Sequence, residues 1–110
     1  MFNDEELLES RLVELGLTAE RIKPSAVDAK IKSVEFHFFD KTVHTVCLLT
    51  LENGFTVTGE NACAHPANYN EQIAREISFK NAREKIWELE GYLLKQRLYE
   101  AQLDKELQIK

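Results

Sequence analysis

Two residues near the middle of the chain have side chains suited to nucleophilic chemistry. Cys63 and His65 are separated by one residue and precede a segment with the pattern of a helix. A thiol beside an imidazole can act as a nucleophile with its base, and a helix N-terminus stabilises a thiolate. Neighbours in sequence rarely have the required side-chain geometry, and no oxyanion donors can be named. We therefore interpret Cys63 as a small buried loop residue, with a thiol-dependent enzyme using Cys63 as an alternative.

The histidines and cysteines do not form a recognisable metal-binding motif. A zinc site needs three or four ligands, which usually occur in closely spaced pairs. His37, His44, Cys63 and His65 would converge only if the sheet and the loop met, and neither Cys-x-x-Cys nor His-x-x-x-His spacing occurs. We predict no metal site, no cofactor and no enzymatic activity.

Residues 60–69 have the composition of an anion-binding loop. Small residues, amides and an aromatic ring precede a helix N-terminus, whose free N–H groups attract anions. A phosphate-bearing or nucleotide-like signal would be sequestered there, with an arginine as its counter-charge. The preferred interpretation is a tightly built connection between sheet and helix. The candidate ligand-binding residues are Glu60, Asn61, Asn68, Tyr69, Arg75 and Arg83.

Composition limits the classes of partner that the protein can bind. The chain has 110 residues, of which 44% are hydrophobic and 30% charged, and a net charge of -5. One soluble domain is therefore expected, and the acidic balance makes nucleic acid an unlikely partner because phosphate binding needs basic surface. No apolar run approaches the roughly 20 residues that span a bilayer. The acidic N-terminus does not resemble a secretory signal, so both cysteines are expected to be free thiols in a cytoplasm.

Hydrophobic periodicity predicts an α+β domain, residues 1–110, in four parts. Residues 1–33 form an N-terminal helical segment, 34–59 a three-stranded antiparallel meander, 60–69 a connecting loop and 70–108 a long helix. The alternation in the meander predicts one apolar face that helices should cover. That face comprises Val34, Phe36, Phe38, Val43, Thr45, Cys47, Leu49, Leu51, Phe55 and Val57. The opposite face is half polar, but Val46 and Leu48 predict that a second helix or another subunit partly buries it.

The turns of the meander predict which residues pair across the strands. A three-residue loop with Gly54 in the left-handed conformation places Leu51 opposite Phe55 and Leu49 opposite Val57. A two-residue Asn-Gly turn would instead put threonines on the apolar face. The preceding loop is expected at residues 39–42, which places Phe38 opposite Val43 and Phe36 opposite Thr45.

The C-terminal section predicts a helix that is too long for the sheet to cover. It begins at an Asn68–Glu71 capping box, and about forty residues at 1.5 Å each extend for about 60 Å. Gly91 is a candidate position for a bend. The expected core stripe is Ile73, Ile77, Ile86, Leu89, Leu93 and Leu94, with Ala74 and Ala82 allowing close approach. Because the excess length needs a partner, we predict a homodimer or higher homo-oligomer, with interface residues Val46, Leu48, Trp87, Tyr92, Leu94 and Leu98.

Three segments of the chain resemble a known family. They are Leu51 to Glu60, then Ala62-Cys63 with Pro66 to Tyr69, and Ala82 to Leu94 around Trp87. The pattern resembles small tailed-phage proteins of the gene product forty-nine and gene sixty-six type, from about Pro24 to Leu98. The resemblance implies a phage protein in the host cytoplasm, with a role outside the virion and no catalytic residues to transfer. It favours a non-enzymatic accessory protein that binds a host component, in host takeover or counter-defence, with sequestration of a small anionic ligand as the alternative.

Overall fold

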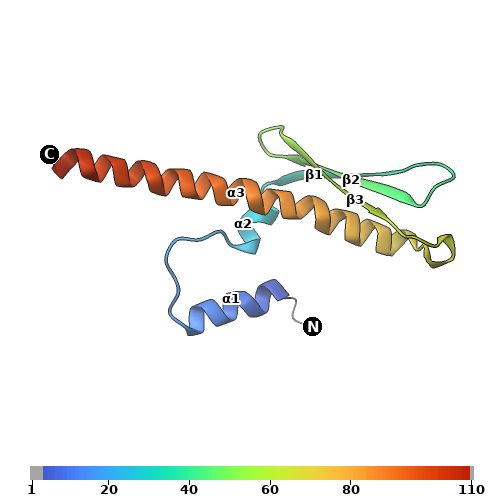
Figure 1. Cartoon of the computed structure of the whole chain (residues 1–110), viewed down its shortest axis with the longest axis horizontal. Coiled ribbons are helices and arrows are strands. Elements are labelled where there is room, and N and C mark those ends of the chain that lie inside the picture. The colour runs from blue at the N-terminus through green and yellow to red at the C-terminus, as the bar shows by residue number, and fades with distance from the viewer. Residues whose placement is uncertain (1–3, 110) are drawn as a thin grey trace.

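The protein is an α+β domain, as the sequence predicts. The computed structural model describes residues 4–109, so the predicted boundaries at residues 1–3 and 110 lie outside the described residues. The sheet is antiparallel with strand order β1-β2-β3, and α3 lies along one of its faces (Figure 1). The elements are α1 Asp4–Glu14, α2 Pro24–Ala29, β1 Ile31–Phe38, β2 His44–Leu51, β3 Thr56–Ala62, the short 3-10 helix η1 Pro66–Asn68 and α3 Glu71–Ile109.

The predicted pairing of β2 with β3 is confirmed. Leu49 lies opposite Val57, and the backbone N–H of Leu51 donates to the carbonyl oxygen of Phe55 at 2.8 Å. Gly54 has φ +90°, the left-handed conformation that the three-residue loop requires. The side chain of Asn53 accepts from the N–H of Phe55 at 3.0 Å and fixes the turn.

The predicted pairing of β1 with β2 is wrong by two residues. Phe38 lies opposite Thr45 and Phe36 opposite Cys47, because the loop between the strands extends over residues 39–43. Its turn uses Lys41 at φ +62°, a conformation that sequence alone would assign to glycine. A shift of two residues leaves every side chain on its expected face. β1 also begins at Ile31, earlier than expected, so Ile31 belongs to the sheet rather than to the preceding helix.

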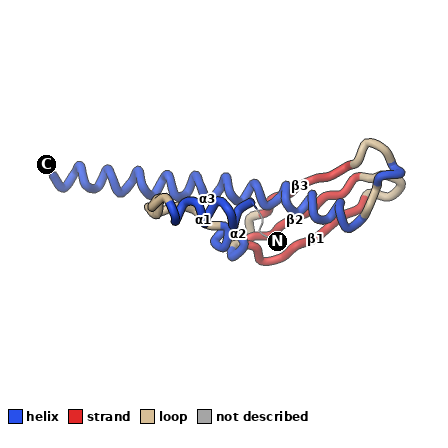
Figure 2. The backbone as a smooth tube through the Cα atoms, turned by 90° about the horizontal axis from the view of Figure 1, so that it is seen from below, coloured by secondary structure: helices blue, strands red, loops and turns tan. Residues whose placement is uncertain are grey.

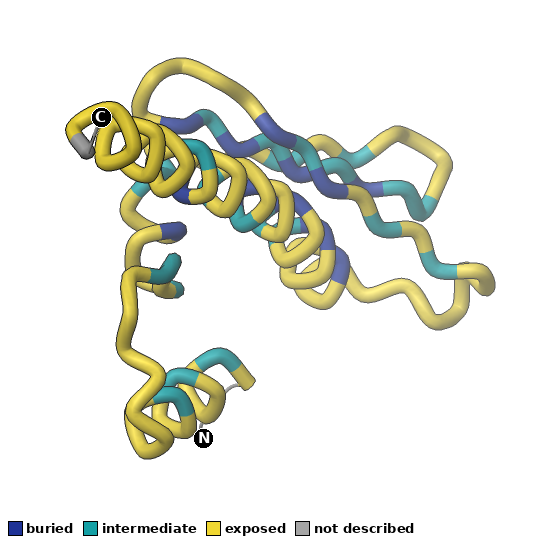
Figure 3. Tube along the Cα trace, turned by 60° about the vertical axis from the view of Figure 1, so that its left-hand side comes forward, coloured by how far each residue is buried: buried dark blue, intermediate teal, exposed yellow. Residues whose placement is uncertain are grey.

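The core forms where α3 crosses β2 and β3. Cys47, Leu49 and Ile86 are fully buried there. Gly59 allows the helix and the sheet to approach this closely, because a Cβ built on Gly59 would stand 2.1 Å from the backbone nitrogen of Ala82. Backbone therefore meets backbone, and Figure 3 shows the buried positions concentrated between helix and sheet.

The stripe of α3 that faces the sheet differs in part from the predicted one, although the close approach at Ala74 and Ala82 is confirmed. Ala74, Ser78 and Ala82 are buried against it, because only small residues fit where the helix touches Gly59. Ser78 satisfies its hydroxyl by donating to the carbonyl oxygen of Ala74 at 2.7 Å. Of the predicted stripe, Ile86 and Leu94 are buried, while the exposed members are Ile73, Ile77, Leu89 and Leu93.

The long helix is confirmed, and it extends beyond the sheet (Figure 2). The domain measures 65 × 33 × 22 Å with a radius of gyration of 18.5 Å, whereas a compact chain of this length would have about 13 Å. The helix continues through Gly91 without interruption. Its first turn is capped by Asn70, whose side chain accepts from the N–H of Ile73 at 2.9 Å; the prediction of Asn68 as the cap is wrong, since Asn68 lies in η1.

Helices cover only one face of the sheet among the described residues (Figures 1 and 2). The opposite face carries Val46 and Leu48, which are nevertheless half-buried by their own sheet neighbours. α2 packs at the β1 side of the core through Val27, which is fully buried. α1 lies apart, on the far side of α3 from the sheet, and contributes no buried residue.

Candidate functional site

Cys63 and His65 do not form a thiol–imidazole pair in this structure. The thiol of Cys63 donates to the backbone carbonyl oxygen of His65 at 3.4 Å, and Nδ1 of His65 accepts from the N–H of Ala67 at 3.1 Å. Both contacts hold the turn at η1 in shape. They agree with a structural role for Cys63, although Cys63 is partly exposed and not buried as predicted, while the thiol-dependent alternative stays a prediction. Cys47 is buried, and burial raises the pKa of its thiol.

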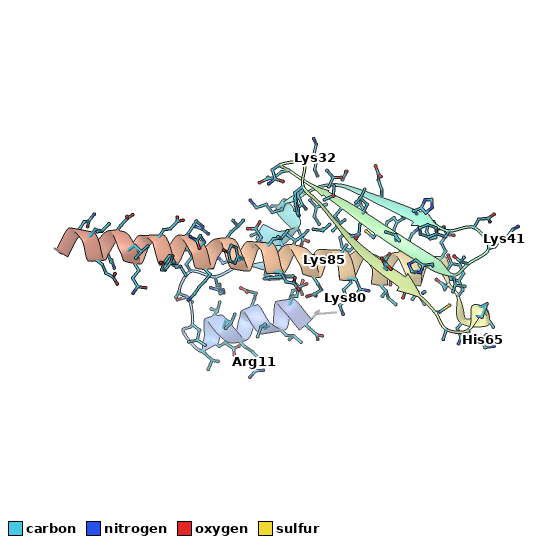
Figure 4. All side chains as sticks on the ribbon, turned by 45° about the horizontal axis from the view of Figure 1, so that its top comes forward. Arg11, Lys32, Lys41, His65, Lys80 and Lys85 are labelled. Carbon is cyan, nitrogen blue, oxygen red and sulfur yellow. The ribbon has the colours of Figure 1, made fainter. Side chains whose placement is uncertain are left out.

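Among residues 4–109, no group of three or more histidine, cysteine or acidic side chains is placed to hold a metal ion. His37 and His44 flank Phe39 through edge-on ring contacts, at centroid distances of 4.5 and 5.7 Å. Nε2 of His44 is also 3.0 Å from a carboxylate oxygen of Glu60. Figure 4 places His65 at the 3-10 turn and Lys41 at the β1–β2 turn, both at one end of the sheet.

The loop residues predicted to bind a ligand are engaged with their neighbours. Glu60 pairs with His44, and its backbone carbonyl accepts from the side chain of Asn81 at 2.9 Å. Asn61 and Asn68 lie at the end of β3 and in η1, and Tyr69 is partly exposed beside them. The loop therefore connects sheet to helix as a series of turns.

The two predicted counter-charges lie in separate environments. Arg75 pairs with Glu71 at 2.9 Å and lies over the rings of Phe36 and Phe38, at 5.7 and 5.2 Å. Arg75 therefore covers the aromatic side chains at the end of β1.

Arg83 connects the three helices α1, α2 and α3, away from the loop of residues 60–69. It donates to Asp28 of α2 at 2.7 Å and to Glu5 of α1 at 2.6 Å, and its guanidinium lies 6.0 Å from the Trp87 ring centre. Burial lowers the pKa of Arg83, but the hydrogen bonds that Arg83 donates to Asp28 and Glu5 outweigh it, and the pKa is raised overall. The six predicted ligand-binding residues thus do not form one site.

The cleft around Arg83 is chemically unsuited to an anion. Its volume is about 620 Å³. Four carboxylates and only two cations line it, so a phosphate would meet net negative charge. Its lining residues are Asp4, Glu5, Asp28, Phe79, Lys80, Arg83 and Glu84.

The predicted interface residues divide into covered and open ones. Leu94 is buried and Trp87 packs against the core cluster within the same chain. Val46 and Leu48 lie half-buried on the uncovered sheet face. Tyr92 and Leu98, by contrast, are 71% and 46% exposed. Only these last two lie on freely accessible helix surface.

The sequence did not indicate the arrangement of α1. This helix faces the rest of the protein with charged side chains, because Glu5 pairs with Arg83 and Glu9 with Arg21 at 2.7 Å. Among its apolar side chains, only Leu12 is partly covered. The exposed ones on α1 and in the turn after it are Leu7, Leu8, Val13, Leu15 and Leu17. We call this set the α1 outer surface.

The α1 outer surface combines apolar and acidic character. Three acidic residues occupy the first turn of the helix, Asp4, Glu5 and Glu6, and one basic residue, Arg11, lies near its end. A surface with exposed leucines among carboxylates suits a protein groove that is apolar at its centre and basic at its rim.

Comparison with known proteins places the chain among phage proteins. Residues 22–98 match the family described as phage protein, N4 Gp49/phage Sf6 gene 66. This match spans well over half of the chain, and the protein therefore belongs to that family. The match confirms the resemblance of the central segments, and it leaves α1 and the end of α3 outside. No curated protein and no solved structure matches the chain. Within residues 4–109, no helix is both long and apolar enough to cross a membrane.

Proposed function

We propose that this phage protein is a non-enzymatic accessory protein that binds a host protein in the host cytoplasm, in host takeover or counter-defence. The supporting observation is the orientation of α1, which exposes Leu7 and Leu8 to solvent while Glu5 and Glu9 pair with arginines of the body. Helices of globular domains normally bury their apolar side chains, because apolar burial drives their packing. A helix that exposes these side chains gains its apolar contacts from another molecule.

The attachment of α1 supports the same proposal. The ion pairs Glu5–Arg83 and Glu9–Arg21 hold it, and the two arginine side chains are only 12% and 20% exposed. These pairs fix the roll of the helix about its axis, so Leu7 and Leu8 keep pointing outward. A preoriented surface loses less conformational entropy on binding than a free segment does.

The overall charge indicates the kind of host protein. The chain carries a net charge of -5, and α1 with its first-turn acids contributes a large part of it. Complementary charge raises association rates and excludes partners of like charge. The proposed target therefore has an apolar groove bordered by lysines or arginines.

The proposal is tested by affinity capture from infected cells with matched variants. Leu8→Glu places a charge in the α1 outer surface, and Ser25→Glu adds the same charge to an exposed polar position of α2. We expect a host protein that copurifies with the wild type and with Ser25→Glu but is lost with Leu8→Glu. The captured protein is then purified and titrated against all three forms.

Identical host proteins with all three forms, or none with any, would contradict the proposal. Circular dichroism of each variant excludes unfolding as the cause, because Leu8 is already 57% exposed and its replacement removes little burial.

A further inference from the structure

The side of α3 that meets the sheet continues for several turns after the sheet has ended. Gln96 and Leu103 come 18 and 25 residues after Ser78, or about five and seven whole turns at 3.6 residues per turn. They therefore point in the direction in which Ser78 meets Gly59. The residues on this line are Leu89, Tyr92, Gln96, Tyr99, Leu103 and Leu107, and we call them the α3 seam.

The α3 seam has the pattern of a coiled coil without a partner. Its first five members are separated by alternating steps of three and four residues, which is the spacing of paired helices. Tyr92 and Leu107 are 71% and 70% exposed, and Tyr99 and Leu103 are exposed as well. The segment of α3 beyond the sheet has no packing to stabilise it within the chain, and most helical stability in proteins comes from packing of an apolar face. The pattern and the exposure together indicate a missing helix.

We propose that a second copy of the chain covers the α3 seam, with the two helices running antiparallel. A parallel pair is excluded by the position of the sheet. The sheet lies on the seam side of α3, over Ser78 and Ala82, so parallel copies would place both sheets between the helices. In the antiparallel pair, each C-terminal half occupies the space beyond the other copy's sheet.

The seam residues match one another in this orientation. With Tyr92 opposite the partner's Leu103, Gln96 lies opposite the partner's Tyr99, and Leu89 lies one residue out of register with the partner's Leu107. Gln96 then has a hydroxyl within reach of its amide. Buried tyrosines contribute about 150–250 Å² each, so two tyrosines and three leucines from each copy provide most of the roughly 800 Å² per partner of a stable interface.

A groove beside the sheet receives the end of the partner helix. It has a volume of about 340 Å³ and lies between β3 and α3, with the half-exposed Phe55 at its rim. Leu89 lines it, and in this register Leu89 lies opposite the partner's residue 106, next to the partner's Leu107, so the last turn of the partner helix comes there. Lys85, also in the lining and labelled in Figure 4, then meets the negative end of the partner helix dipole. The full lining is Phe55, Thr56, Val57, Thr58, Lys85, Glu88 and Leu89.

Light scattering at micromolar concentration tests the association. We expect the wild type to have twice the 12.7 kDa chain mass. Leu103→Lys should give the single-chain mass, whereas Leu98→Lys, which changes an exposed leucine on the opposite side of the same helix, should keep the doubled mass. A wild type of single-chain mass, or equal behaviour of the two variants, overturns the proposal. Circular dichroism should show that both variants remain helical.

Disulfide cross-linking tests the orientation. In a Cys63→Ser background, the double variant Tyr92→Cys with Leu103→Cys should form covalent dimers on mild oxidation, while each single variant should not. The two positions lie 11 residues apart on one helix, about 16 Å, so they cannot be joined within a chain. Cross-linking of Tyr92→Cys alone would indicate parallel copies and would overturn the antiparallel arrangement.

Discussion

Gly59 of β3 and Ala82 of α3 touch through their backbones. A Cβ on Gly59 would be 2.1 Å from the Ala82 nitrogen and 2.3 Å from the carbonyl oxygen of Ser78. Both atoms belong to main chain held by helical hydrogen bonds, so neither can move aside alone. The separation of sheet and helix, and with it the packing of Cys47 and Leu49 beneath the crossing, depends on the absence of a side chain at position 59.

Gly59→Ala should therefore destabilise the protein strongly. The helix must move away from the sheet, which loses contacts along the whole crossing, and overpacking of this kind costs about 1–3 kcal/mol or more. We expect a decrease of about 3 kcal/mol in the free energy of unfolding, measured by urea denaturation.

Gly91→Ala provides the matched control. This glycine lies in the interior of α3, and an added Cβ would meet nothing within 4 Å. Alanine is favoured over glycine in a helix by about 1 kcal/mol, so this variant should be more stable than the wild type. If both substitutions changed stability in the same direction, the close crossing at Gly59 would not be the cause.

The close crossing also explains which part of the fold the sequence predicted and which part it did not. Hydrophobicity alone assigns Ile73 and Ile77 to the core side of α3. The helix instead uses Ala74, Ser78 and Ala82, because closeness to Gly59 outweighs the burial of larger side chains. Gly59 was visible in the sequence, but its partner on a distant helix was not.

The strand pairings show the same limit. The β2–β3 turn has a glycine at its left-handed position, and its geometry followed from Asn53 and Gly54. The β1–β2 turn places Lys41 at a positive φ. A lysine in the sequence does not indicate this conformation, as a glycine would. The loop length was therefore underestimated, although the period of two still gave the correct faces.

The candidate binding surfaces were only partly foreseen. The excess length of α3 and the exposure of Tyr92 and Leu98 follow from pattern and length. The outward rotation of α1 does not, because it depends on Arg83 and Arg21, which are 78 and 12 residues away from their carboxylate partners. Such distant ion pairs have no local signature in the sequence.

Removing the Arg83 side chain should release α1 from the body. In Arg83→Ala, Glu5 and Asp28 lose the guanidinium that pairs with both of them. This ion-pair site is neither fully exposed nor fully buried. We expect a loss of about 1–3 kcal/mol in the free energy of unfolding and faster amide hydrogen exchange in α1. Arg97→Ala is the control, since its pair with Glu20 is more than half exposed on both sides and should contribute less than about 1 kcal/mol. Equal losses in the two variants would rule out the role assigned to Arg83.

The two cysteines should react with alkylating reagents at very different rates. Cys63 is partly exposed and Cys47 is buried, and burial raises the pKa of Cys47 and keeps its thiol protonated. Mass spectrometry of native protein treated with iodoacetamide should show one modification, at Cys63, and a second only after denaturation. Because the pKa of Cys47 is raised in the folded state, its contribution to stability is present at neutral pH and is lost as the pH rises through that raised pKa. Rapid native modification of Cys47 would contradict this account.

Thr45 offers a way to stabilise the core. Its side chain is fully buried near the start of β2, and its hydroxyl oxygen has no hydrogen-bond partner. An unsatisfied buried polar group costs about 1–3 kcal/mol, and valine has nearly the same shape with a methyl group in place of the hydroxyl. Thr45→Val should therefore raise the free energy of unfolding by about 1 kcal/mol, measured by urea denaturation, while Thr45→Ala, which removes the methyl group as well, should show a smaller gain or a loss. A loss of stability in Thr45→Val would mean that the hydroxyl finds a partner in solution.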